Sequence, residues 1–246
     1  MLLIKLIGFD LDDCLFDSTG LSESARIKGI DAMLDQGLRI EKNKAIAILM
    51  EIVEEYGSNF SHHYDYFIRR LNQTDENVKL SFNTQYKLIA SAVMAYHKEK
   101  IDSIELYDDV KETLIELRDR KIKTAVITDG IPIKQYEKII RLKIDKLIDL
   151  VVISDEVGIR KPNPELFNYF LKKFKVKGEE TIYIGDRIDK DIIPAKKNNI
   201  HSVYIHRGGK YDIYPSEKKF PKDFKPDYEI RSLKKIFDII DELNMK

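Results

Sequence analysis

Residues 2–17 read LLIKLIGFDLDDCLFD, an apolar run that stops abruptly at Asp10. Residues 3–9 are short and almost continuously apolar, which is typical of a strand buried on both faces. Asp10 and Asp12 then place two carboxylates two positions apart where this strand should end. Like charges held close repel each other, and burial adds a desolvation cost. A divalent cation, or chemistry that uses two carboxylates in different protonation states, would compensate for that cost.

Four further short apolar runs resemble the first, and helical patterns separate them. The expected strands are residues 3–9, 122–128, 150–154, 181–184 and 202–205. The expected helices are residues 108–121, 133–142, 163–174 and 191–199, with a last helix at 232–243. Strands that alternate with helices imply right-handed crossovers. We therefore predict an α/β fold with a doubly wound parallel sheet, and an irregular surface path over residues 206–227.

The stretch between the first two strands has a different character. From about residue 18 to residue 102 there is almost no strand signal, and apolar residues recur at three- and four-residue spacing. Residues 45–56 show this spacing before Gly57, a helix stop, and residues 86–96 repeat it. Because the block is too long for a loop, we predict an inserted helical domain. The predicted domains are a core of residues 1–16 and 104–246 and a helical insert of residues 17–103.

Charge and cysteine content restrict the partners and the compartment. The 246 residues include 42 basic and 42 acidic ones, which gives a formal net charge of +0. This balance disfavours nucleic acid and anionic membranes as partners, since both favour net positive charge. Cys14 is the only cysteine, so a reducing compartment is expected. The N-terminal apolar run is too short for a signal peptide or a membrane span, and we expect a soluble, cytoplasmic protein.

Polar side chains follow the predicted strands, and ligands of doubly wound sheets bind outside the carboxyl ends of strands. Each of these residues taken alone could be a turn residue or a helix cap. Together, and each after its own strand, they indicate one site at one sheet edge. In chain order they are Asp10 and Asp12, Thr128 and Asp129, Lys161, and then Asp186 and Asp191.

The acidic members of this set suit phosphoryl transfer. An ionised Asp10 can attack phosphorus and form an aspartyl-phosphate. Mg²⁺ prefers hard oxygen ligands, which Asp10, Asp186 and a main-chain oxygen at Asp12 could supply. Asp12 could also protonate the leaving alkoxide and later take a proton from water.

The remaining members suit the binding of a phosphoryl group. Lys161 would place a compact positive charge against the phosphoryl oxygens. Thr128 and nearby main-chain N–H groups would donate hydrogen bonds to the same oxygens, and Asp129, which follows Thr128, is also expected among the substrate-binding residues. The set therefore predicts an enzyme that binds a small phosphorylated metabolite.

These motifs resemble those of the haloacid dehalogenase (HAD) superfamily, in a form with a helical cap inserted after the first strand. The matching motifs are Asp10-Leu11-Asp12, Thr128, Lys161 and the stretch from Gly185 to Asp191. The resemblance implies a nucleophile at Asp10, an acid/base at Asp12, phosphate contacts from Thr128 and Lys161, metal ligands at Asp10, Asp12 (main chain) and Asp186, and a supporting carboxylate at Asp191.

Two positions refine the resemblance. The dehalogenases of the superfamily lack an acid at the position of Asp12, because a halide leaves without a proton. An aspartate there therefore favours phosphate ester hydrolysis. Cys14 stands where Thr or Val is usual, and a small, weakly polar thiol should affect the chemistry little.

Within the superfamily, the chain is similar to an archaeal subgroup of glyceraldehyde 3-phosphate phosphatases. The residues that carry this likeness are 57–60, 64–66, 69–71, 128–130 and 134–139. The likeness implies Mg²⁺-dependent hydrolysis of small phosphate monoesters, with glyceraldehyde 3-phosphate as the leading substrate.

Other interpretations stay open. The substrate could be another sugar phosphate or a glycolate-type phosphate, or the chain could be a non-catalytic binding protein with this fold. A dehalogenase is the remaining alternative. His62 and His63 are adjacent on a predicted helix and point apart, so we expect surface positions rather than a metal pair.

Overall fold

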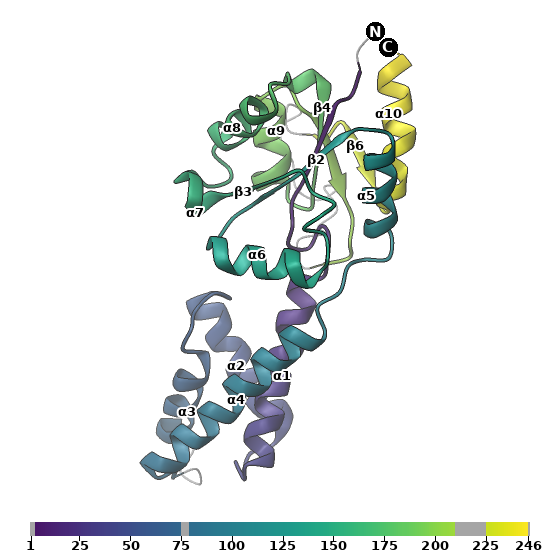
Figure 1. Cartoon of the computed structure of the whole chain (residues 1–246). Helices are drawn as coiled ribbons and strands as arrows, with labels where there is room; N and C mark the ends of the chain where they lie inside the picture. The colour runs from purple at the N-terminus through teal and green to yellow at the C-terminus, as the bar shows by residue number, and fades with distance from the viewer. Residues whose placement is uncertain (1–2, 75–78, 210–224, 246) are drawn as a thin grey trace. The chain divides into compact units, whose positions relative to one another are not determined.

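The computed structural model describes residues 3–74, 79–209 and 225–245 (Figure 1). The chain divides into two compact units, Met1–Thr19 with Ile104–Lys246 and Gly20–Ser103. We call the first the core unit and the second the helical unit. Of the irregular path predicted for residues 206–227, residues 210–224 lie outside the described residues.

The core unit is built on a six-stranded parallel sheet with the order β3-β2-β1-β4-β5-β6. Its strands are β1 Leu6–Phe9, β2 Lys123–Thr128, β3 Leu150–Ile153, β4 Thr181–Gly185, β5 His201–Ile205 and β6 Tyr228–Ile230. The central strand β1 pairs with β2 and β4 and is buried along its whole length. Burial on both faces explains why its sequence is continuously apolar. The predicted α/β fold with a doubly wound parallel sheet is confirmed.

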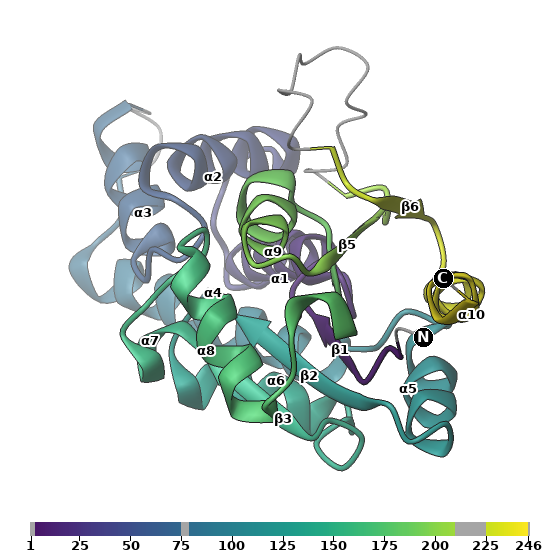
Figure 2. The same cartoon turned by 90° about the horizontal axis from the view of Figure 1, so that it is seen from above.

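Helices cover both faces of this sheet (Figure 2). On one face, α8 (Pro164–Phe174) and α9 (Ile193–Lys197) contribute to an apolar cluster with side chains of the strands. On the other lie α5 (Val110–Asp119) and α10 (Ile236–Met245). The unit also contains α6 (Pro132–Arg141), which is as long as α5 and α10. Shorter segments complete it: α7 (Ser154–Val157) and 3-10 turns at Gly178–Glu180 and Leu233–Lys235.

Two elements differ from the sequence prediction. The strand β6 was not expected, because three residues are too few to show a pattern. The helix expected at residues 191–199 is shorter and begins as a π-helical turn, Ile188–Ile192, before α9. Such turns are rare and are frequent at functional sites. Here the turn carries Asp191, one of the candidate site residues.

The helical unit lies between β1 and β2 in the sequence, so the predicted helical insertion is confirmed. Its helices are α1 (Ser18–Asp35), α2 (Lys42–Tyr56), α3 (His63–Thr74) and α4 (Phe82–Asp102). They share a core that includes Leu49, Phe67 and Leu88. Gly57 ends α2 with a φ of 83°, a value that favours glycine and explains the helix stop.

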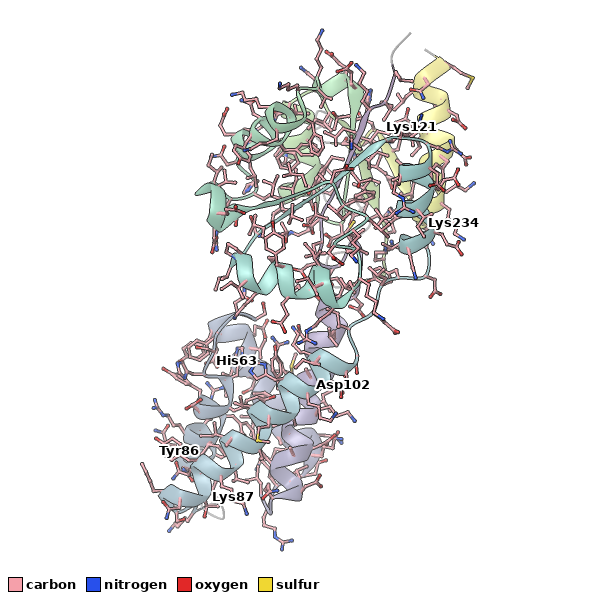
Figure 3. The ribbon with its side chains drawn as sticks, viewed as in Figure 1. His63, Tyr86, Lys87, Asp102, Lys121 and Lys234 are labelled. Atoms are coloured by element: carbon pink, nitrogen blue, oxygen red, sulfur yellow. The ribbon has the colours of Figure 1, made fainter. Side chains whose placement is uncertain are left out.

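One of the two adjacent histidines corrects the sequence analysis. His62 is exposed, as expected, and its Nδ1 lies 3.6 Å from Asp65 Oδ2. His63 is buried, and its Nε2 lies 3.0 Å from the carbonyl oxygen of Gly57 (Figure 3). Burial lowers the pKa of His63. The surface position expected for His63 was therefore wrong, because this first residue of α3 turns toward the end of α2.

Within the described ranges 3–74, 79–209 and 225–245, no helix has both the length and the apolar composition that crossing a membrane requires.

Truncating the core of the helical unit should destabilise the chain. Phe67→Ala removes a fully buried ring and should lower the free energy of unfolding by about 3–5 kcal/mol, because a cavity remains in its place. Urea unfolding followed by circular dichroism measures the change. The exposed neighbour variant Lys87→Ala should stay within about 0.5 kcal/mol of wild type. Equal effects of the two substitutions would contradict the described packing.

Candidate active site

The candidate residues come from successive strand ends of the core unit. Asp10 directly follows β1, Thr128 ends β2, and Asp186 directly follows β4. Lys161 lies in the loop between α7 and α8, and Asp191 lies in the π-helical turn. All five side chains are buried. The expectation that these residues gather at the carboxyl edge of the sheet agrees with the contacts described next.

Lys161 is the cation at the centre of this group. Its Nζ donates to Asp10 Oδ1 at 2.5 Å and to Asp191 Oδ1 at 2.8 Å. The hydroxyl of Tyr183 lies 3.3 Å from the same nitrogen. Burial by itself would lower the pKa of Lys161, but the two carboxylates raise it well above its ordinary value. Lys161 therefore stays protonated in the buried site.

Three carboxylates form the acidic part of the site. Asp10, Asp186 and Asp191 each offer an oxygen that lies within 4.8 Å of the others. Burial raises the pKa of Asp10 to about 7, although Lys161 counteracts this. Burial, and then the charges of Asp10 and Asp191, raise the pKa of Asp186 to about 9. Ionising both groups without a counter-charge is therefore unfavourable.

The donor set fits a hard divalent cation. Asp186 Oδ1 is buried and accepts no hydrogen bond from any described residue. An unpartnered buried carboxylate oxygen is costly, and a cation would provide its missing partner. The sequence indicated Asp10, Asp186 and a main-chain oxygen at Asp12 as ligands. The carboxylate of Asp191 lies beside this set, but its Oδ1 accepts from Lys161 and its Oδ2 from the main chain of Arg187, which agrees with a supporting role.

The Asp12 side chain lies outside this carboxylate cluster. Its two oxygens accept hydrogen bonds from Lys138 Nζ at 2.7 and 2.8 Å. Lys138 projects from α6, 126 residues further along the chain. The sequence analysis included Lys138 in the stretch 134–139 that carries the likeness to the archaeal phosphatases, but it gave this residue no role. Lys138 is the clearest residue that sequence reasoning missed.

Asp129 and Thr128 are held by neighbours from two other segments. Asp129 Oδ1 accepts a hydrogen bond from the main-chain nitrogen of Lys161 at 3.1 Å. Gln135 Nε2 donates to Thr128 Oγ1 at 3.2 Å and also to the carbonyl oxygen of Asp129. Gln135 was not predicted either. Asp129, which directly follows β2, therefore also positions the main chain of Lys161.

The bend after β4 requires glycine. A Cβ atom built on Gly185 would lie 2.4 Å from Asp191 Cγ, which is closer than real side chains approach. Asp191 Oδ2 also accepts a hydrogen bond from the main-chain nitrogen of Arg187 at 3.1 Å. The absence of a side chain at Gly185 therefore lets Asp191 reach Lys161.

Cys14 lies close to this group but takes no part in it. The thiol is fully buried, and its Sγ lies 3.7 Å from the carbonyl oxygen of Ile184. Burial raises the pKa of Cys14 well above its ordinary value. A buried, protonated thiol is a poor nucleophile, in agreement with the small effect expected from the sequence.

A family model described as a haloacid dehalogenase-like hydrolase matches residues 34–205. The chain belongs to this family. It is 39% identical over 243 residues to the glyceraldehyde 3-phosphate phosphatase of Methanopyrus kandleri, covering 98% of this chain and 99% of that protein. It is 40% identical over 242 residues to the protein of the same name from Methanocaldococcus jannaschii, with 98% and 99% covered. The resemblance to this family and to the archaeal phosphatases is confirmed, and so is the predicted enzyme class.

A solved structure shares the fold at lower identity. A HAD-hydrolase of Bacillus subtilis, solved bound to magnesium, superposes with a TM-score of 0.62 at 19% identity. The match covers 97% of this chain and 99% of that one. This likeness shows the fold of the family and nothing more specific.

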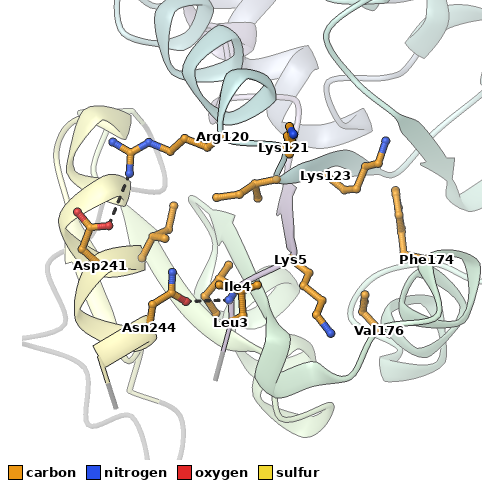
Figure 4. Close-up of a pocket in the computed structure, with 12 residues that line it drawn as sticks. Leu3, Ile4, Lys5, Arg120, Lys121, Lys123, Phe174, Val176, Asp241 and Asn244 are labelled. Carbon is orange, nitrogen blue, oxygen red and sulfur yellow. Dashed lines mark hydrogen bonds and ion pairs between the residues drawn. The ribbon is translucent and has the colours of Figure 1, made fainter. Parts of the chain in front are cut away.

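A separate cavity of about 480 Å³ lies at the amino ends of β1 and β2 (Figure 4). Lys5 and Lys123 contribute to its lining, together with apolar side chains such as Phe174. Lys5 pairs with Glu180, and Lys123 Nζ lies 2.6 Å from Asp149 Oδ1. This cavity is therefore at the opposite ends of the strands from the carboxylates, and both Lys5 and Lys123 are already paired with acids.

The raised carboxyl pKa values predict a loss of stability as pH rises in a chelating buffer. The folded chain keeps protons on Asp10 and Asp186 up to pKa values of about 7 and about 9, whereas an unfolded chain releases them near pH 4. Between about pH 4 and about pH 9 the folded state binds more protons than the unfolded state, so the free energy of unfolding falls as pH increases.

A divalent cation should reverse this loss, more strongly at about pH 8.5 than at about pH 6, because it replaces the protons. Thermal unfolding midpoints with and without the cation measure the effect. Asp186→Asn should flatten the pH dependence and weaken the response to the cation. The matched control Asp189→Asn alters an exposed carboxylate and should retain both. A midpoint that does not respond to the cation at either pH would contradict the assignment.

Proposed function

We propose that the chain is a Mg²⁺-dependent phosphatase that hydrolyses glyceraldehyde 3-phosphate through an aspartyl-phosphate. The observation that carries the proposal is the buried group of Asp10, Asp186 and Asp191 around the Lys161 ammonium. The substrate is supported by the two archaeal relatives, which carry that substrate in their names at 39% and 40% identity. Another sugar phosphate or a glycolate-type phosphate would use the same chemistry.

Asp10 is the proposed nucleophile. The Lys161 ammonium donates a hydrogen bond to Oδ1 of Asp10 and so favours the ionised form of this carboxylate, whose second oxygen is Oδ2. Mg²⁺ would be held by Asp10, Asp186 and the main-chain oxygen of Asp12, and when bound it would neutralise negative charge on the phosphoryl group. Asp191 positions Lys161 through its Oδ1.

Lys161, Thr128 and Asp129 are proposed to bind the phosphate. The Lys161 ammonium would stabilise the charge on the phosphoryl oxygens, and the Thr128 hydroxyl would donate a hydrogen bond to them. Gln135 restrains the Thr128 hydroxyl, and Asp129 restrains the Lys161 main chain. Preorganised donors of this kind stabilise the transition state without having to reorient.

Asp12 is the proposed acid and base. It would give a proton to the leaving alkoxide and then take one from the water that attacks the phosphorus of the intermediate. Lys138 holds both oxygens of its carboxylate and so fixes the side-chain direction. A group that transfers a proton must be placed accurately, and Lys138 is therefore proposed as its positioning residue.

The helical unit is proposed to be the cap of this enzyme, with residues 17–103 as its extent and residues 1–16 and 104–246 as the core. The compact units, Gly20–Ser103 and the remainder, support a division close to these bounds. We further propose a cytoplasmic enzyme whose partner is a small phosphorylated metabolite, with no nucleic-acid or membrane partner. The balanced charge and the single buried cysteine support this.

Phosphate release from a panel of esters tests the function. With Mg²⁺, glyceraldehyde 3-phosphate should be hydrolysed faster than 2-phosphoglycolate or other sugar phosphates, and Asp10→Asn should abolish release because the nucleophile is lost. Asp12→Asn should lower kcat by about 10² to 10⁴-fold and keep the Mg²⁺ affinity, because its metal contact is through the main chain. A well-folded wild type that binds these esters without releasing phosphate would favour the binding-protein alternative.

Lys138 has a test of its own. Lys138→Met should lower kcat by about 10²-fold with little change in KM, since Asp12 loses its fixed position. An aryl phosphate should be affected less, because its leaving group needs no proton. Lys138→Arg should restore part of the rate, and the exposed neighbour variant Lys134→Met should match wild type. Equal losses for the alkyl and aryl esters would argue against a role through Asp12.

A further inference from the structure

The helix α4 leaves most of its apolar side chains in solvent. It has 21 residues and buries only Leu88 and Ala92. Among the described residues, twelve large apolar side chains are exposed, and five of them belong to this one helix. They are Phe82 (71% exposed), Tyr86 (55%), Val93 (36%), Met94 (72%) and Ile101 (44%).

These exposed side chains lie on a single face of the helix. Four of the exposed side chains, those of Phe82, Tyr86, Val93 and Ile101, fall within an arc of about 100° around the helix axis at 3.6 residues per turn. Met94 lies at the margin of this arc. The arc is opposite the face that carries Leu88 and Ala92, and it contains the small residue Ala90 near its middle. We call this face the α4 stripe; it consists of Phe82, Tyr86, Ala90, Val93, His97 and Ile101.

The α4 stripe extends along almost the whole helix. Nineteen steps at about 1.5 Å per residue give a length of about 28 Å from Phe82 to Ile101. In Figure 3, Tyr86 lies near one end of α4 and Asp102 at the other. Exposed apolar side chains that are contiguous on one face are a mark of an interaction site, whereas singly scattered ones are ordinary.

The α4 stripe is complementary to itself when two copies run antiparallel. With the two-fold axis at the point between Ser91 and Ala92, each apolar residue meets an apolar or aromatic residue of the other copy. The opposed pairs are Phe82 with Ile101, Tyr86 with His97, and Ala90 with Val93. A two-fold interface requires this property, because the same patch must fit itself. Ala90 beside the axis would let the two helices approach closely.

The charges around the α4 stripe agree with pairing between copies. None of its six members is an aspartate, glutamate, lysine or arginine, and its one histidine, His97, would face Tyr86 of the other copy. Lys100 lies at one edge of the arc, donates to Ser22 Oγ of its own chain at 3.0 Å, and would face Asn83 of the other copy. Lys87 and Lys98 lie outside the arc, and Lys98 pairs with Asp102 of its own helix. The chain as a whole has no net charge to repel a second copy.

We propose that the α4 stripe is the interface of a homodimer in which a second copy of this chain packs its α4 antiparallel, about a two-fold axis between Ser91 and Ala92. The interface lies in the helical unit and uses none of the candidate active-site residues. It therefore stands whether or not the proposed substrate is correct.

Sedimentation velocity of the full chain over a range of concentrations tests the dimer. Wild type should reach a mass of about twice 28.8 kDa as the concentration rises. Ala90→Glu places two carboxylates beside the axis and should leave a monomer. Ile133→Arg charges an exposed apolar position on α6, outside the α4 stripe, and should stay dimeric. Circular dichroism should show that all variants remain folded.

A charge pair tests the register and direction. In the double variant Ala90→Glu with Val93→Lys, each new carboxylate would face a new ammonium of the other copy, and dimerisation should return. The matched double variant Ala90→Glu with Met94→Lys has the same net charge, but its lysine is displaced from that position, and it should remain monomeric. If both double variants form dimers, or if neither does, the antiparallel register is overturned.

Three results would overturn the proposal as a whole. The first is a wild-type chain that stays monomeric at every concentration. The second is a dimer that Ala90→Glu does not weaken, since the interface would then lie elsewhere. The third is a monomer that binds anionic lipid vesicles and loses this binding in Ala90→Glu, which would assign the α4 stripe to a membrane surface.

Discussion

The Lys161 ammonium between Asp10 and Asp191 is the interaction on which the rest of the site depends. Three carboxylates crowd a buried space, and each would repel the others and lose its hydration without a counter-charge. One lysine compensates only part of that charge, as the raised pKa of Asp186 and its unpartnered Oδ1 indicate. A divalent cation would balance the remaining negative charge. Without a cation, this charge makes it unfavourable to ionise all three carboxylates.

The parallel sheet explains how one lysine can reach these acids. Strands β1 and β4 are neighbours and point the same way, so Asp10 and Asp186 emerge side by side at the same edge. The π-helical turn after β4 then directs Asp191 back towards Lys161, and Gly185 leaves the space for it. The buried strands thus provide rigid supports, and the irregular segments that follow them carry the chemistry.

The helical unit shows a different use of apolar side chains. Its four helices share one core, yet α4 contributes only two fully buried side chains to it and exposes a second apolar face. An amphipathic helix normally buries its apolar face within its own domain. An apolar face on the outside, complementary to itself about a two-fold axis, indicates that part of this unit's burial takes place between copies of the chain.

Periodicity and strand-end motifs are local features, so they already indicate the alternation of strands and helices, the helical insertion and the strand-end residues from Asp10 to Asp191. Sequence reasoning gave no role to Lys138, which holds Asp12, or to Gln135, which holds Thr128. It also placed His63 wrongly and did not reveal β6. The Lys138–Asp12 contact joins residues 126 positions apart, so only the packed fold brings them within hydrogen-bonding distance. Gln135 and His63 contact residues only 7 and 6 positions away, but these contacts depend on how the first turns of α6 and α3 fold back toward the preceding segment, which hydrophobic periodicity does not specify.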